Sequence, residues 1–407
     1  MSVSVRLITE DEFEAWDTLI TNVFGEDPRP EDMESFRNRI EFDRARAAFD
    51  GDEMVGTAGE HSYRMTLPGG TRVPAGAVTV VVVKSTHRRR GVLREMMRDQ
   101  LAAVKEREEP LAALWSSESA IYGRFGYGPA MEGGEYTIER QHTALAVPEA
   151  TEGRVRQIDV EEAKLVIPPL YEKATAEIPG TMTRRDCDWT GYFRDPEHWR
   201  DGASANRFVI FEDGKGEPRG YVRYRQKPKW DEAHAVHELR VGEMHTLDAT
   251  AYAALYRYLF SIDLVTKVKL INRRLHEPLL QMLADPRRLR GVRAERIWLR
   301  MLDVPALLSA RSYPVEGELV LEVVDDFMDL AGGRFLLQAG PDGAECVRTD
   351  REPDLTLSIA DLGSAYLGVP RLWEQHWVGR VDGDQEAVRR AQSMFSWHIE
   401  PWCTVFF

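Results

Sequence analysis

The chain has 407 residues, of which 43 % are apolar and 29 % charged, so it is long enough for two or three globular domains. Its formal net charge of −14 argues against nucleic acid as a partner and favours cationic small molecules. No apolar stretch approaches the roughly 20 residues of a membrane helix and no secretory signal is visible, so we expect a cytoplasmic protein with no membrane partner.

The three cysteines, Cys187, Cys346 and Cys403, lie far apart and form no metal-binding pair, and the ten histidines show no metal-ligand spacing. We therefore expect no metal and no disulfide framework, as is usual in a reducing compartment.

The first segment, residues 1–150, alternates strand and helix patterns. Strands are expected within residues 44–83, with turns at Asp50-Gly51 and Gly69-Gly70. A helix from about Gly91 to Glu108 follows, because its apolar residues recur at helical spacing. The stretch "LAALWSS" after it predicts another buried strand.

A linker rich in Ala, Pro and Glu, residues 143–153, leads into a second segment, residues 151–302. "VRLITEDEFEAWDTLI" near the start of the chain is echoed by "VRQIDVEEAKLVIPPLY", and residues 237–263 again predict a strand, a turn and an amphipathic helix. We interpret this as an internal duplication of low identity, with a chance likeness as the alternative.

The third segment, residues 303–407, has short alternating strands and helical patterns around 361–368 and 384–396. This mixture is typical of a small α+β domain, in which "WCTVFF" is predicted to be the closing strand.

The clearest chemical signal is "VTVVVVKSTHRRRGVLREMM", residues 78–97, in which a buried strand leads through a basic loop into a helix. Gly91 at the head of the helix lets backbone N–H groups approach an anion, and the helix N-terminus favours negative charge. Arg88, Arg89 and Arg90 add cationic donors, so the loop predicts a diphosphate cradle. The spacing fits neither a P-loop nor a dinucleotide fingerprint. The alternative is that the arginines merely solvate the helix start.

Read as Arg88-x-x-Gly91-x-Leu93, the loop resembles the acyl-CoA loop of the GCN5-related N-acetyltransferases, although Leu93 replaces the usual small residue. "THRRRGVLREMM" and "SESAIYGRFGYGPA" together resemble the Eis (enhanced intracellular survival) family, which carries Leu there. The resemblance implies an α+β protein with two tandem acetyltransferase folds, residues 1–150 and 151–302, and a sterol-carrier-protein-like domain, residues 303–407. "GEMHTLDATA" in the second fold has no arginine cluster, so we expect no CoA site there.

The resemblance implies acetyl-CoA as the acetyl donor. Backbone N–H groups near Val81–Val83, where the strand must splay, are the expected oxyanion donors. The loop motif and the resemblance together place acetyl-CoA contacts at Val81, Val82, Val83, Arg88, Arg89, Arg90, Gly91, Val92, Leu93, Arg94, Ser117 and Glu118.

The Tyr-x-x-x-Gly-aromatic pattern of the superfamily places the general acid at Tyr122, whereas Tyr127 is expected to be structural. The alternative for Tyr122 is a core tyrosine with a satisfied hydroxyl. No side chain is an obvious base, since His87 and Glu118 have competing roles in holding the loop. The resemblance implies that the C-terminal carboxylate, here that of Phe407, is the general base. We expect aromatic packing to raise its pKa from about 3.3–3.7 by desolvation.

The resemblance also implies amines of small polycationic molecules as substrates, with aminoglycosides as the class and lysine side chains as a further one. The best-known branch of the Eis family has an acidic residue where this chain has Phe406. This difference puts an identical substrate preference in doubt. Phe24, Glu26, Asp27 and Phe36 are candidates for an acidic, aromatic-edged cleft, although acids before a helix are also ordinary helix-start residues.

Direct attack in a ternary complex is expected, because no cysteine lies near the motifs to carry an acyl group. The resemblance implies a homohexamer. The alternatives are an acetyltransferase for one narrow metabolic amine, and a protein whose C-terminal domain binds a lipid or another apolar ligand.

Overall fold

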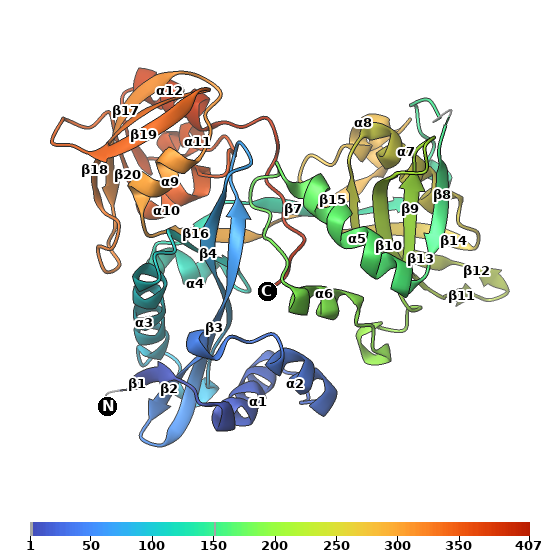
Figure 1. Ribbon diagram of the computed structural model, residues 1–407, viewed down its shortest axis with the longest axis horizontal. Helices are drawn as coiled ribbons and strands as arrows, with labels where there is room; N and C mark the ends of the chain where they lie inside the picture. Colours follow the sequence, from blue (N-terminus) through green and yellow to red (C-terminus); the bar gives the residue numbers. More distant parts are fainter. Residues whose placement is uncertain (1–2, 150–151) are drawn as a thin grey trace. The chain divides into compact units, whose positions relative to one another are not determined.

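The computed structural model describes residues 3–149 and 152–407, so the predicted boundary between residues 150 and 151 lies outside the described residues. It divides into two compact units (Figure 1). The first contains the chain up to Met131, Ile178–Cys187 and Glu295–Phe407, and the second contains Glu132–Glu177 and Asp188–Ala294. No helix in the described ranges is long and apolar enough to cross a bilayer.

The first unit is built on a seven-stranded sheet in which β4 and β5 run parallel and the other recorded pairs are antiparallel. In sheet order the strands are β1 (Ser4–Leu7), β2 (Arg46–Asp50), β3 (Glu53–Thr66), β4 (Arg72–Val83), β5 (Leu111–Trp115), β16 (Ile297–Met301) and β6 (Gly128–Pro129). The predicted turns at residues 50–51 and 69–70 are confirmed.

Helices bury apolar stripes against this sheet. The helices of this part are α1 (Phe13–Phe24), α2 (Pro30–Arg37), α3 (Val92–Glu106) and α4 (Ser119–Tyr122). Trp16 on α1 is fully buried in one core cluster, and Met97 and Leu101 on α3 pack in another with Leu114. The helix predicted from about Gly91 to Glu108 is therefore confirmed, with its ends a residue or two inside the expected range.

Two strands are exchanged relative to the predicted segments. β7 (Glu132–Glu139), which falls in the predicted first segment, belongs to the second unit's sheet, whereas β16 from the predicted second segment completes the first sheet beside β5. The proposed borders followed a change in composition, and composition does not reveal which sheet a strand joins.

The second unit repeats the plan of the first around another seven-stranded sheet, whose parallel pair is β13 and β14. In sheet order the strands are β15 (Arg290–Glu295), β7, β14 (Val265–Arg273), β13 (His237–Thr246), β10 (Pro218–Lys227), β9 (Arg207–Glu212) and β8 (Arg154–Ile158). The other elements are α5 (Val160–Thr175), α6 (Asp186–Phe193), α7 (Ala249–Ser261), α8 (Leu279–Met282) and the hairpin β11 (Trp230–Asp231) and β12 (His234–Ala235).

The C-terminal domain, within the first unit, has a five-stranded sheet in the order β19-β18-β17-β20-β21. Its strands are β17 (Gly317–Val324), β18 (Gly333–Gly340), β19 (Gly343–Arg348), β20 (Leu355–Ser358) and β21 (Val381–Gly383), and its helices are α9 (Val304–Ala310), α10 (Ile359–Ala365), α11 (Leu372–Trp377) and α12 (Gln385–Phe395). The helices predicted around 361–368 and 384–396 correspond to α10 and α12.

The prediction of "WCTVFF" as a closing strand was wrong. Residues 401–407 form an extended tail outside the C-terminal sheet. The amide of Trp402 donates to the carbonyl of Pro179 at 2.9 Å, and the Thr181 hydroxyl donates to the Trp402 carbonyl at 2.8 Å. Segment 178–187, which we call the strap, also pairs with the end of β3, where Gly180 N donates to Thr66 O at 2.8 Å.

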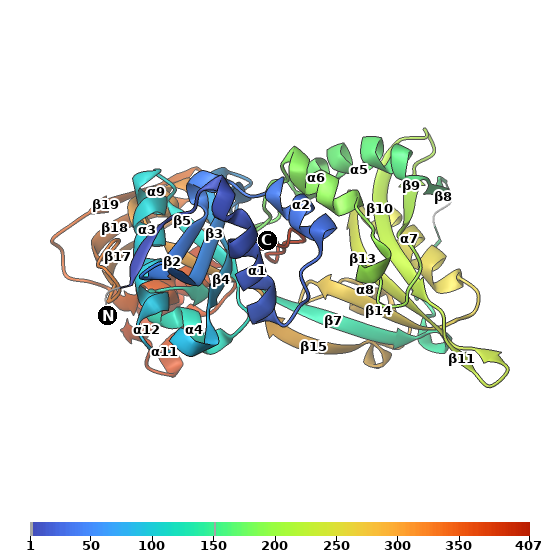
Figure 2. The same cartoon turned by 90° about the horizontal axis from the view of Figure 1, so that it is seen from below.

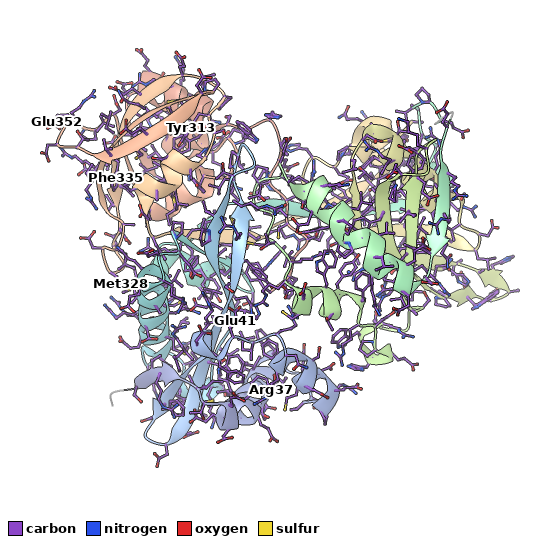
Figure 3. All side chains as sticks on the ribbon, viewed as in Figure 1. Arg37, Glu41, Tyr313, Met328, Phe335 and Glu352 are labelled. Atoms are coloured by element: carbon purple, nitrogen blue, oxygen red, sulfur yellow. The ribbon has the colours of Figure 1, made fainter. Side chains whose placement is uncertain are left out.

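A buried ion pair joins the C-terminal domain to the first sheet. Arg300 on β16 donates from one nitrogen to both carboxylate oxygens of Asp325, at 2.8 and 2.7 Å, and neither side chain is exposed. The same carboxylate accepts from the amides of Leu330 and Ala331, so the loop after β17 is fixed at several points. Figure 3 labels Met328 at the tip of this loop.

We expect Asp325→Ala to lower the free energy of unfolding by about 3–5 kcal/mol, because it leaves the Arg300 guanidinium buried without its acid. Asp326→Ala, one residue along and exposed, is the matched control and should change it by less than about 0.5 kcal/mol. Urea unfolding followed by circular dichroism measures the free energy of unfolding of both variants. Equal effects would show that the Arg300–Asp325 pair does not hold the C-terminal domain to the first sheet.

Candidate active site

A cavity of about 890 Å³ opens in the first unit between the end of β4, the start of α3 and the loop after β5. All the predicted cofactor contacts except Arg90 line it, which brings residues 81–94 and 117–118 to one place. The Arg90 side chain is about half exposed, and its guanidinium instead lies 4.0 Å from the carboxylate of Asp50.

The cavity exists because two parallel strands part. The register of β4 with β5 runs from Ala75 and Leu111 to Val78 and Leu114, whereas β4 continues to Val83. Val80 has a positive φ of 48°, and the pairing of β4 with β3 shifts register there. This bulge bends the strand, so that Val81–Val83 line the opening as expected.

The basic loop enters α3 through residues with a left-handed backbone. Gly91 is the residue before the helix, with φ 86°, and it places no side chain over the first-turn N–H groups. Arg89 also has a positive φ of 63°. Within the described ranges, no acid lies at ion-pair distance from Arg88 or Arg89, so both cations are available to an anion. The residues present therefore fit a diphosphate.

The second fold begins its corresponding helix differently. Its helix α7 begins at Asp248, whose carboxylate accepts from the amide of Ala251 at 2.9 Å. Asp248 also pairs with Arg219 at 3.0 Å. An acid thus covers the helix N-terminus, which would repel a phosphate there.

His87, which the sequence analysis set aside as a base because of a competing role in the loop, lines the cavity. Its Nε2 lies 3.4 Å from Asp50 Oδ2, and its Nδ1 lies 2.8 Å from the hydroxyl of Thr86. Both ring nitrogens therefore hold the loop, which is the competing role that the sequence suggested.

Tyr122 lies at the end of α4 and lines the cavity although it is buried. Burial, and then the negative charge of Glu118, raise the pKa of the Tyr122 phenol to about 12. The hydroxyl is thus protonated at neutral pH, the state that a general acid requires. Tyr127, whose ring lies 6.0 Å away, is fully buried and does not line the cavity, as expected for a structural residue.

The C-terminal tail, whose end is marked in Figure 2, contacts residues of β3 and β5. The Phe407 ring is 8 % exposed and lies 5.8 Å from the Tyr63 ring and 6.5 Å from the Trp115 ring. The Trp115 indole also donates to the carbonyl of Val405 at 3.0 Å. Phe407 is not among the residues that line the cavity, but Trp115 stands two positions before Ser117, which does.

The residues of the predicted acidic cleft are separated. Phe24, at the end of α1, is exposed and lines the cavity. Glu26 and Asp27 are exposed in the loop between α1 and α2. Phe36 instead stacks on Trp16 at 5.9 Å, as part of the core beneath α1.

Several lining residues were not predicted. Arg124 and Phe125 lie within the quoted "SESAIYGRFGYGPA" motif, so their closeness in sequence to Tyr122 could have predicted that they line the cavity. Phe327 comes from the C-terminal domain, more than 200 residues from the motif, and has no sequence signal. The others are Val23 and Ile121.

No group of three His, Cys, Asp or Glu side chains suited to a metal ion occurs in the part that the structure describes.

Comparison with known proteins agrees with this geometry. Acetyltransferase (GNAT) domain models match residues 4–130 and 180–301, and a sterol carrier protein domain model matches residues 304–404. N-acetyltransferase Eis of Mycobacterium tuberculosis is 31% identical over 409 residues, covering 97% of each chain. The chain belongs to the Eis family of GCN5-related N-acetyltransferases.

An uncharacterised N-acetyltransferase of Streptomyces avermitilis is 40% identical over 405 residues, or 99% of each chain. The crystal structure of Eis1 from Mycobacterium abscessus superimposes with a TM-score of 0.86 at 30% identity, covering 99% of this chain and 100% of that one. The predicted α+β fold class is thereby confirmed, and the protein is an N-acetyltransferase. The acetyltransferase fold implies acetyl-CoA as the acetyl donor. The open N-terminus of α3 and the cations of Arg88 and Arg89 suit its diphosphate.

We expect Gly91→Ala to weaken acetyl-CoA binding, because its φ of 86° would cost an alanine about 1–2 kcal/mol although the surrounding space is open. Gly123→Ala is the matched control, since Gly123 has a right-handed φ of −56° and equally open space beside the same cavity. Calorimetric titration with acetyl-CoA should show a loss for the first variant only. Equal affinities would mean that the loop backbone does not shape the site.

Proposed function

We propose that the protein transfers an acetyl group to amines of small polycationic molecules such as aminoglycosides, by direct attack in a ternary complex. The observation that carries this proposal is that Tyr122 and the basic loop line one cavity. The fixed C-terminal tail contacts Trp115, two positions before Ser117 on the wall of that cavity. Acetyl-CoA, when bound, supplies the thioester whose carbonyl carbon accepts the amine.

The chain supplies the remaining steps. Backbone N–H groups near Val81–Val83 donate to the oxyanion, and the Tyr122 hydroxyl donates to the departing sulfur. With a pKa of about 12 for the buried phenol against about 8.5 for an ordinary thiol in water, full transfer of that proton would be uphill by about 5 kcal/mol. Tyr122 would therefore donate efficiently only to a sulfur whose basicity is raised by desolvation in the same cavity.

The Phe407 carboxylate takes the proton of the attacking ammonium. Support comes from the fixation of the tail by the strap and by Trp115, which holds the chain end rather than leaving it frayed. Direct attack is favoured because no cysteine lines the cavity within the described residues, and Cys403 is buried with its sulfur against the carbonyl of Val405.

The polycationic class is supported by the net charge of −14, by Phe24 on the cavity wall and by the exposed Glu26 and Asp27 nearby in sequence. Phe406 is 75 % exposed and lies 5.5 Å from Trp115, so it offers an aromatic surface where the family's best-known branch has an acid. Lysine side chains of peptides are a further class within the proposal. A cytoplasmic homohexamer is also proposed, on the family resemblance alone.

Two alternatives differ in what they require. A narrow metabolic amine would use the same machinery, and turnover of one amine alone would identify it. A lipid-binding role would need an apolar cavity, whereas the cavity of about 380 Å³ on the C-terminal domain is lined by Arg334, Arg348, Thr349 and Asp350.

We expect Tyr122→Phe to lower kcat by about 10²–10⁴ with little change in acetyl-CoA affinity, because only the proton donor is lost. Since burial keeps the phenol neutral, the pH dependence of the residual rate should match the intact enzyme from about pH 6 to 9. Thiol release from acetyl-CoA measures the rate. Tyr127→Phe serves as the control, and an equal loss there would contradict a specific role for Tyr122.

Three variants of the chain end test the base. Deleting Phe407, or adding one glycine after it, moves the carboxylate by about 3.8 Å, so each should lower kcat by about 10²-fold or more. Phe407→Ala keeps the carboxylate and removes the ring, so it should retain more activity than either. Turnover of a panel of aminoglycosides and diamines provides the measurement. Unchanged rates in the first two variants would rule out the carboxylate as base.

A further inference from the structure

The ring of the last residue packs on a group of side chains that the proposed mechanism does not use. Tyr63 on β3 is buried, and its ring lies 5.8 Å from the Phe407 ring. The guanidinium of Arg185 lies over the Tyr63 ring, 4.9 Å from its centroid. Arg185 is in the strap, which belongs to the same compact unit as β3 and the tail. Tyr63 thus contacts both a strap cation and the last residue.

Glu41, which is labelled in Figure 3, holds Arg185 in this position. Its carboxylate accepts from the Arg185 guanidinium and, at 2.9 and 2.6 Å, from the amide and the hydroxyl of Ser62. Arg44 lies 3.3 Å from the same carboxylate. Ser62 comes directly before Tyr63 on β3, so one acid fixes both the cation over the ring and the backbone that carries the ring. Glu41 and Arg185 are mostly buried, which makes their pairing stronger than that of an exposed ion pair.

Hydrogen bonds fix the tail only as far as Val405, which accepts from the Trp115 indole. Within the described ranges, Phe407 makes no hydrogen bond. Its ring, in contrast, contacts the rings of Tyr63 and Trp115. The place of the last residue, and with it that of the chain-end carboxylate, therefore depends on ring contacts.

We propose that Arg185 and Glu41 are positioning residues for the chain end. Glu41 holds Arg185, and Arg185 holds the Tyr63 ring through a cation–π contact. Tyr63 in turn holds the ring of Phe407. A base must lie within hydrogen-bond reach of the proton that it takes, and a misplacement of about 1 Å can cost about 10²-fold in rate. The inference rests on the proposed role of the Phe407 carboxylate as base.

Arg185→Gln should lower kcat by about 10-fold, a smaller loss than removing the carboxylate, because the base is displaced but still present. The KM for acetyl-CoA should not change, since Arg185 does not line the cavity assigned to acetyl-CoA. Arg185→Lys keeps a charge for Glu41 but cannot lie flat on the ring, so it should restore only part of the rate. Steady-state kinetics of the full chain with the panel of aminoglycosides and diamines gives both constants. A rise in the KM for acetyl-CoA that matches the fall in kcat would contradict a positioning role.

Glu41→Gln removes the charge that holds Arg185 and should lower kcat to a similar extent. Arg6→Gln is the matched control. Arg6 also pairs with an acid, Glu12 at 2.6 Å, and lies over a ring, that of Phe49 at 4.0 Å, but it is on the edge strand β1. Its replacement should leave kcat unchanged. An unchanged kcat in both Arg185→Gln and Glu41→Gln, or an equal loss in Arg6→Gln, would overturn the proposal.

A double-mutant cycle with Phe407→Ala tests whether Arg185 acts through the last ring. Phe407→Ala keeps the carboxylate and removes the ring that Tyr63 holds. Adding Arg185→Gln to this variant should therefore change kcat by less than about 2-fold. A loss of about 10-fold in both backgrounds would show that Arg185 acts by another route and would overturn the proposal. Full activity of a chain lacking Phe407 would instead overturn the proposed base itself.

Discussion

The site depends on one constraint, which is that the pairing of β4 with β5 stops several residues before β4 itself ends. Beyond Val78 and Leu114 the strands no longer share hydrogen bonds, and the bulge at Val80 turns the end of β4 aside. The opening leaves backbone groups of β4 that a complete sheet would have paired with β5, and the proposed acetyl transfer uses them as oxyanion donors. The α3 N-terminus and Tyr122 line the same cavity.

The C-terminal domain completes this cavity instead of standing apart from it. Its loop after β17 is tied to β16 by the buried Arg300–Asp325 pair, which places Phe327 on the cavity wall. Its tail runs along the strap to Trp115 at the end of β5. The domain therefore contacts the acetyltransferase fold at two points. Its loop after β17 lies at the cavity, and its tail lies beside the end of β5.

Local features were readable from the sequence, and features that join distant parts were not. The basic loop and the helix at Gly91 follow from spacing and turn chemistry within a few residues, whereas Tyr122 was predicted from the resemblance to the acetyltransferase superfamily. The exchange of β7 and β16 depends on pairing between strands far apart in the chain, which leaves no local pattern. The tail looked like a strand because it is apolar, but its partners are the strap, some 220 residues earlier, and Trp115, 290 residues before Val405. Phe327 follows two aspartates in a loop with no motif.

The account's central claim is that the chain end takes the proton. The most direct test labels phenylalanine with ¹³C at the carboxyl carbon and follows the terminal carboxyl signal by NMR as a function of pH. The account predicts that this signal titrates with the same midpoint as the acidic limb of kcat/KM, since that limb reports the free enzyme's base. A difference of more than about one pH unit between the two midpoints would contradict it.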